Sequence, residues 1–112
     1  MPKHIAELDR VFRALTDPTR RAVLERLSQG PSAVTELARP FRMTLPSFSQ
    51  HLDVLEESGL VESSKVGRTR TYRLAPRPLR LAQRWMEQQR GSSERRLDQL
   101  ERYLEGLKEQ TE

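Results

Sequence analysis

The chain has 112 residues and a net charge of +4, with 35% hydrophobic residues, 32% charged residues and no cysteine. This length suits a single domain, residues 1–112, and the missing cysteine excludes disulfides, thiolate metal sites and cysteine nucleophiles. No apolar run approaches membrane-spanning length, and the segment MPKHIAELDR lacks a signal-peptide core, so we expect a cytoplasmic protein with no membrane partner.

The first 28 residues predict two amphipathic helices. Asp17 is a suitable cap for the second helix, which opens with Pro18 and should run to about Ser28, before the stop signal Gly30-Pro31. On the first helix, residues 4–15, the apolar stripe is formed by Ile5, Leu8, Val11, Phe12 and Leu15. On the second, the core side should hold Ala22, Val23, Leu24 and Leu27, and the outer side Arg20, Arg21, Glu25 and Arg26.

A helix-turn-helix is expected at about residues 33–58. Its first helix should run from about Ala33 to Pro40, with Ser32 as its cap. A tight link through Arg42 leads to the second helix, for which Thr44 is a suitable cap. Two short helices joined by a brief turn define the motif.

The second helix of this motif has two different faces. Leu45, Phe48, Leu52 and Leu55 recur at helical spacing and should form its buried stripe, and a glycine at position 59 should end it. The exposed N-terminal face carries Pro46, Ser47, Ser49 and Gln50, with no carboxylate before Asp53. Short side chains and an amide suit entry into a DNA groove, although an ordinary amphipathic helix with a polar outer face has the same pattern.

Residues 60–74 predict a basic β-hairpin. Two extended segments flank the turn Gly67-Arg68, with Val61, Tyr72 and Leu74 expected to face the core. Eight Lys or Arg residues lie between positions 65 and 90, opposed there by one acid. Those at or near the hairpin tip and exposed face are Lys65, Arg68, Arg70 and Arg73. A basic hairpin directly after a polar-faced helix is typical of a wing that reaches phosphates or the minor groove, although a charge run alone more often marks a solvated surface.

Three segments, DPTRRAVLERL, SQHLDVLEESGLV and VGRTRTYRL, closely resemble the ArsR/SmtB winged-helix repressors. The resemblance extends from about Val11 to Leu107. It implies a mainly α fold with a small β-hairpin, namely a winged helix-turn-helix with a long C-terminal dimerisation helix. It also implies sequence-specific binding of double-stranded DNA by a transcriptional regulator, most simply a homodimeric repressor.

The resemblance further implies which residues contact bases, namely Pro46, Ser47, Ser49 and Gln50. His51 lies between the two helix faces, so packing or a phosphate contact is as good an assignment as a base contact. We expect the wing and the helix cap to hold phosphates or reach the minor groove, through Thr44, Lys65, Arg68 and Arg70.

A terminal helix is expected at about residues 77–108. Its apolar stripe is interrupted at Gly91-Ser92-Ser93 but keeps its phase, so we expect one long helix, with a bend at Gly91 left open. So small a body cannot bury the stripe, which should pair with a second copy through Leu97, Leu100, Leu104 and Leu107. Two recognition helices related by a two-fold axis should then bind an inverted-repeat operator.

No cofactor, metal site or catalytic centre is expected. The two histidines, His4 and His51, are far apart in the sequence, and the terminal helix contains none. Ser49 and His51 are two residues apart on a helix and point in different directions, which argues against a nucleophile and its base. The alternative to DNA binding is a winged-helix module that binds a protein. The sequence leaves open whether a small molecule or a protein acts as an effector.

Overall fold

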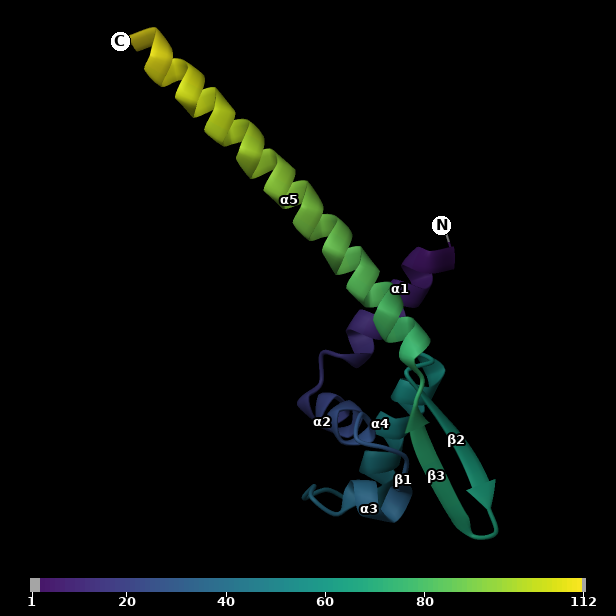
Figure 1. The fold of residues 1–112 in the computed structure, drawn as a ribbon. Helices are drawn as coiled ribbons and strands as arrows, with labels where there is room; N and C mark the ends of the chain where they lie inside the picture. The colour runs from purple at the N-terminus through teal and green to yellow at the C-terminus, as the bar shows by residue number, and fades with distance from the viewer. Residues whose placement is uncertain (1–2, 112) are drawn as a thin grey trace. The chain divides into compact units, whose positions relative to one another are not determined.

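The computed structural model describes residues 3–111 of the chain, excluding the side chains at positions 3, 4 and 111 (Figure 1). Glu112, which ends the expected domain, and the side chain of His4 therefore lie outside the described residues. The elements in chain order are α1 (Lys3–Ala14), α2 (Pro18–Leu27), β1 (Ser32–Ala33), α3 (Val34–Ala38), α4 (Leu45–Glu57), β2 (Val61–Val66), β3 (Thr69–Leu74) and α5 (Pro76–Thr111). The expected fold class is confirmed: a mainly helical chain with a small antiparallel sheet and a long terminal helix.

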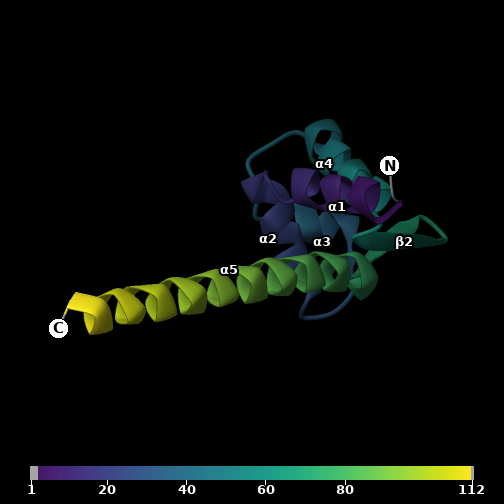
Figure 2. The same ribbon diagram turned by 90° about the horizontal axis from the view of Figure 1, so that it is seen from above.

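The chain forms two compact units, one ending at Ala82 and one beginning at Gln83. In the first unit, helices α1 to α4 gather together and the β2–β3 hairpin projects from them (Figure 2). Its core draws on every helix of the unit and on the sheet. The buried apolar residues are Val11, Ala14, Val23, Leu24, Leu27, Leu37, Phe48, Leu52, Leu55, Leu60, Val61, Tyr72 and Ala82.

The expected stripe of α4 is right at three positions and wrong at the fourth. Phe48, Leu52 and Leu55 are at most 1% exposed, whereas Leu45 is 55% exposed. The ring of Phe41, from the loop before α4, packs 5.3 Å from that of Phe48 and belongs to the half-buried margin of the core. Phe41 therefore packs against the N-terminal end of the buried stripe, at Phe48.

Three local signals in the sequence produce the expected helix ends. Asp17 accepts a hydrogen bond from the backbone N–H of Arg20, and Thr44 accepts one from that of Ser47, so both are N-caps. After α4, Gly59 adopts a φ of 78°, a left-handed conformation that favours glycine. The N–H of Leu60 donates to the carbonyl oxygen of Leu55 at 3.0 Å, and the N–H of Gly59 to that of Glu56 at 3.0 Å, which is the Schellman pattern.

The sheet has the antiparallel strand order β1-β3-β2. The β2–β3 hairpin was expected, and Gly67, with a φ of 62°, occupies the first position of its two-residue turn, as a type II′ turn requires. Strand β1 was not expected. Ser32 pairs with Tyr72 in this strand, so its assignment as a helix cap is wrong: Ala33 occupies the N-cap position of α3 without a side-chain hydrogen bond.

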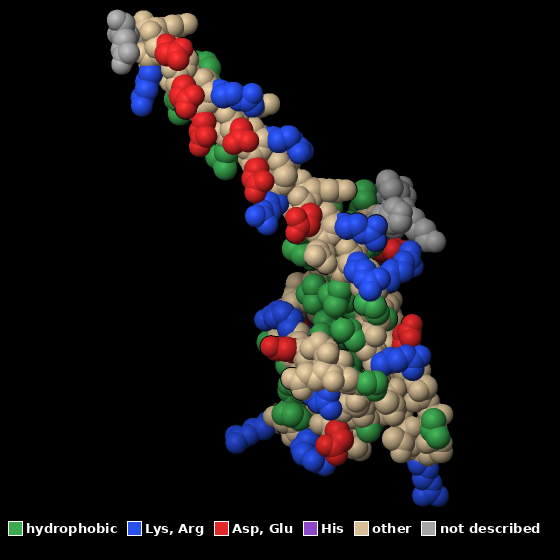
Figure 3. All heavy atoms as spheres, viewed as in Figure 1, with side chains coloured by type: hydrophobic (Ala, Val, Ile, Leu, Met, Phe, Trp, Pro, Cys, Tyr) green, Lys and Arg blue, Asp and Glu red, His purple; other side chains and the backbone are tan. Residues whose placement is uncertain are grey.

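Helix α5 is one uninterrupted helix that continues through Gly91. Beyond Ala82 none of its described side chains is buried within the single chain. The expected leucine stripe is exposed along it, where Figure 3 shows hydrophobic side chains among charged ones. Within residues 3–111, no helix is both long enough and apolar enough to cross a membrane.

Candidate nucleic-acid interface

The N-terminal turns of α4 present the side chains expected to read bases. Pro46, Ser47 and Gln50 are exposed, and Ser49 is half-buried beside them. The first acidic residue of the helix is Asp53, so no carboxylate in α4 opposes an approaching phosphate before that position. This end of the helix also carries the positive end of the helix dipole.

The cap of α4 uses part of this polar surface. The backbone N–H of Ser47 donates to the Oγ1 of Thr44 at 3.3 Å, and that hydroxyl donates to the Oγ of Ser47 at 3.0 Å. Both hydroxyl groups therefore have partners within the protein, whereas the Gln50 amide makes no hydrogen bond to another described side chain. The amide is the group at this end with the most hydrogen-bonding capacity for a base edge.

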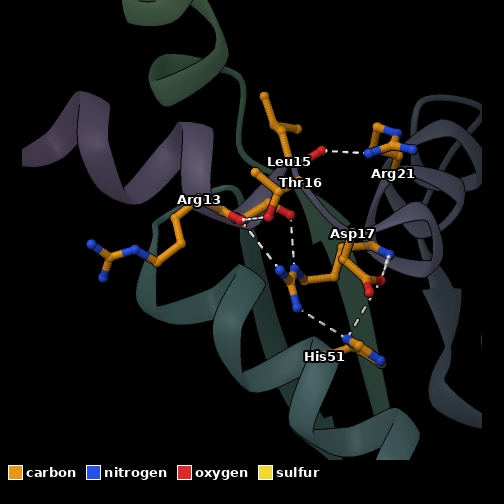
Figure 4. Close-up of polar contacts among 8 residues, drawn as sticks. Arg13, Leu15, Thr16, Asp17, Arg21 and His51 are labelled. Atoms are coloured by element: carbon orange, nitrogen blue, oxygen red, sulfur yellow. Dashed lines mark hydrogen bonds and ion pairs between the residues drawn. The ribbon is translucent and has the colours of Figure 1, made fainter.

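A polar network at the start of α2 holds the middle of α4 in place (Figure 4). The guanidinium of Arg20 donates through Nε to the carbonyl oxygen of Ala14 at 2.7 Å and through Nη2 to that of Arg13 at 3.2 Å. Its Nη1 lies 3.1 Å from the Nδ1 of His51. Arg20 thus links the end of α1 to α4.

Asp17 completes this network. Its Oδ2 accepts from the backbone N–H of Arg20 at 3.0 Å and lies 3.6 Å from the Nδ1 of His51. Burial would raise the pKa of the Asp17 carboxyl, but the backbone N–H of Arg20 and the charges of His51 and Arg20 together lower it below its usual value. His51 is half-buried and contacts Arg20 and Asp17, and these contacts fit the packing role, one of the assignments left open by the sequence.

The position of Arg20 differs from the one that its helical spacing predicts. It was expected on the outer side of α2, yet it is half-buried and reaches back to two carbonyl oxygens of α1. Arg21 is exposed, as expected, and donates to the carbonyl oxygen of Leu15 at 2.7 Å. Helical spacing locates the Cα of an arginine but not the direction of its long side chain, so no sequence signal marked either contact.

The register of the wing divides its basic residues between two faces. Lys65 pairs with Arg70, and both lie on the same face as Val61 and Tyr72, which are buried, because side chains alternate along a strand. Arg70 donates to the Oγ of Ser63 at 2.9 Å, and Ser63 in turn donates to the Oε1 of a glutamate at the end of α4, position 56. Arg70 is therefore tied to the side of the wing that packs against α4.

On the other face of the wing, the basic side chain near the base of the hairpin is paired with an acidic one. Arg73 pairs with Glu62, with 3.1 Å between Nη2 and Oε2. Arg68 lies in the turn between β2 and β3, is exposed, and belongs to the hairpin tip, where Figure 3 shows a Lys or Arg side chain projecting. Among the four basic residues of the hairpin, Lys65 and Arg68 are thus the ones available to a phosphate, and Arg70 is held at one side by Ser63.

A cavity of about 320 Å³ lies on the first unit, away from the base-reading end of α4. It is lined by α1, the end of α4, the base of the hairpin and the start of α5. Its charged lining consists of Glu7, Arg10, Glu57, Glu62 and Arg77. Among the residues that the structure describes, no three or more His, Asp or Glu side chains come together in a group that could hold a metal ion.

A polar-faced helix at the end of a helix-turn-helix, followed directly by a basic hairpin, defines a winged helix-turn-helix protein. Comparison with known proteins agrees. A helix-turn-helix domain family matches residues 15–64. The transcriptional regulator Rv2034 of Mycobacterium tuberculosis is 50% identical over 68 residues, which are 61% of this chain and 64% of that protein. The repressor SdpR of Bacillus subtilis is 32% identical over 79 residues, which are 70% of this chain and 88% of that protein.

Solved structures lead to the same class. The ArsR family transcriptional regulator RHA00566 has a TM-score of 0.79 and 46% identity, with 84% of this chain and 97% of that chain covered. The homodimeric winged helix-turn-helix DNA-binding domain Mb0332 from Mycobacterium bovis has a TM-score of 0.61 and 31% identity, with 81% and 82% covered. This chain belongs to the ArsR family of winged helix-turn-helix transcriptional regulators.

Proposed function

We propose that this protein is a homodimeric transcriptional repressor that binds an inverted repeat in double-stranded DNA. The observation that carries the proposal is the exposed N-terminal end of α4, which presents small and amide side chains and no carboxylate before Asp53. A surface built to bind a protein would instead present apolar side chains across this face. Occupation of an operator by such a dimer would block access of polymerase to an overlapping promoter.

The base-reading role belongs to four residues of α4. Gln50 can donate and accept at the same time, which is the pattern needed for the N6 and N7 of adenine. Ser49 is half-buried and can make a shorter contact on the same face. The four base-reading residues are Pro46, Ser47, Ser49 and Gln50.

The wing and the helix cap supply contacts that do not depend on base sequence. Arg68 at the exposed tip is placed to enter the minor groove or to contact a phosphate, and Lys65 and Arg70 extend this surface along one face of the hairpin. Thr44 joins them through its backbone at the start of α4. These contacts should set the overall affinity and its dependence on salt.

The second copy is held by the terminal helix. Four leucines recur along α5 at alternating spacings of three and four residues and remain exposed in the single chain. This spacing is that of the a and d positions of a coiled coil, which bury one stripe against a partner helix. The stripe consists of Leu97, Leu100, Leu104 and Leu107. The homodimeric state of the similar domain Mb0332 supports the same assembly.

Selection of bound fragments from genomic DNA by the purified full-length protein tests this function. We expect enrichment of one sequence with two-fold symmetry and half-site centres separated by roughly one helical turn, about 10 base pairs. Footprinting should then show both half-sites protected together. A protein without specific, salt-dependent affinity for DNA would be a protein-binding module instead, and protection of one half-site by a monomer would refute the dimer.

A further inference from the structure

Leu45, the first residue of α4, is an apolar side chain left exposed beside the base-reading residues. The three later members of its helical stripe are buried, whereas Leu45 is 55% exposed. The first buried member of the stripe, Phe48, packs against the ring of Phe41, from the loop before the helix. More than half of Leu45 therefore stays exposed in the single chain, next to the residues expected to read bases.

The position of Leu45 on α4 links it to the groove-facing surface. Residues four apart on a helix face the same way, so Leu45 lies one turn ahead of Ser49 on one edge of the helix. The hydroxyl of Ser47 accepts a hydrogen bond from the hydroxyl of Thr44 and keeps its own proton to donate. The first turn of α4 thus adds one large aliphatic side chain, that of Leu45, beside the small and polar side chains of the base-reading face.

We propose that Leu45 contacts the C5-methyl group of a thymine and so selects one A·T base pair in each half-site. This rests on the proposed function, in which the N-terminal end of α4 enters the major groove. The thymine methyl is the apolar group that base edges present in that groove, and apolar side chains recognise it by removing it from water. A leucine cannot hydrogen-bond, so the methyl group is the feature of a base edge that it can distinguish.

Replacing thymine by deoxyuridine tests the contact, because it removes the methyl group and leaves base pairing unchanged. Duplexes carrying the selected operator would have deoxyuridine at each thymine in turn, and the full-length protein would be titrated against each of them. Loss of one buried methyl should weaken binding about fourfold per half-site, which corresponds to about 0.8 kcal/mol. Substitution in both half-sites should weaken it about fifteenfold, and one thymine position per half-site should respond.

Variants of the protein assign the response to Leu45. Leu45→Ala should bind the unmodified operator about fourfold more weakly per half-site and should no longer respond to deoxyuridine at that position. Leu45→Met keeps a flexible apolar side chain and should retain the response. Val66, an exposed aliphatic residue near the wing tip, supplies the matched control: Val66→Ala should retain the response in full.

Each outcome decides the assignment. If no thymine responds in the wild-type protein, or if the response persists in Leu45→Ala, Leu45 does not read a methyl group, while specific DNA binding stands. If no operator is selected, the proposed function fails and this inference fails with it. Alanine favours the helix at an exposed position, so Leu45→Ala should fold, and circular dichroism would confirm this. Should it not fold, the deoxyuridine scan of the wild-type protein still decides whether a methyl group is read.

Discussion

Replacing Leu100 and Leu104 by alanine should convert the dimer to monomer. The two side chains are 52% and 50% exposed in the single chain, so pairing can bury about the remaining half of each. Full burial of a leucine contributes about 2 kcal/mol, so each half contributes about 1 kcal/mol. Two leucines on each of two protomers then give about 4 kcal/mol, or on the order of a thousandfold in the dimer dissociation constant. Cavities left in a tight interface would add to this loss.

Light scattering across a series of protein concentrations measures this change directly. A gel-shift titration of the same variant should show weaker DNA binding, because two half-sites are no longer engaged together. Gln99→Ala with Arg102→Ala is the matched control, since these exposed residues of α5 lie outside the leucine stripe. A dimer that survives the leucine substitutions would refute this reasoning and move the interface elsewhere, with α1 and its exposed Ile5 as the next candidate.

Three further predictions concern the wing, the recognition helix and metal. Arg68→Ala should weaken binding to all DNA sequences and lower the salt slope by about one unit per half-site. Arg73→Ala should leave the slope unchanged because Arg73 is paired with Glu62, so equal slopes in both variants would contradict the wing assignment. Gln50→Ala should cost about 1–3 kcal/mol of discrimination at one base pair per half-site, and equal weakening on specific and random DNA would remove its reading role. A chelator should change neither mass nor DNA affinity, and a loss of either would reveal a metal site that the sequence does not suggest.

Much of the fold could be predicted because its signals are local. The caps Asp17 and Thr44 and the left-handed Gly59 act through the backbone within a few residues, so the sequence alone locates the helix ends. The hairpin is equally local, since a glycine in its two-residue turn determines its register. Strand β1 has two residues and pairs with a strand that is about forty positions later, so no local pattern could predict it.

The candidate interface was less predictable because it depends on how side chains pack and how strands pair in the folded chain. Helical spacing puts Leu45 on the buried stripe, but only the structure shows that Phe41 occupies the position beside Phe48. The sequence treats the four basic residues of the hairpin alike, whereas the strand register separates Arg73, which is paired with Glu62, from those facing α4. The assignments of base-reading and phosphate-binding residues therefore stay predictions that depend on the experiments above.

The network that joins α1, α2 and α4 through Arg20 and Asp17 gives a prediction about acid stability. Asp17→Ala should destabilise the protein by about 1 kcal/mol at neutral pH, because it removes both the N-cap of α2 and the charge beside His51 and Arg20. Asp17→Asn should cost less, because asparagine caps a helix about as well as aspartate and only the charge is lost. The difference between wild type and Asp17→Asn therefore isolates the contribution of the carboxylate charge.

The sign of this contribution follows from the lowered pKa of Asp17 in the folded protein. A carboxyl whose folded pKa lies below its unfolded value of about 3.9 stabilises the folded state above that value, and the contribution is lost as pH falls through the folded pKa. The free energy of unfolding of both proteins should therefore be measured by urea denaturation from pH 7 to pH 2, at one fixed protein concentration because the protein is proposed to be a dimer. We expect a constant difference from pH 7 to about pH 5 and a difference that shrinks toward zero below about pH 4. A difference that stays the same at pH 2, or grows there, would mean that the Asp17 charge does not stabilise its network with Arg20 and His51.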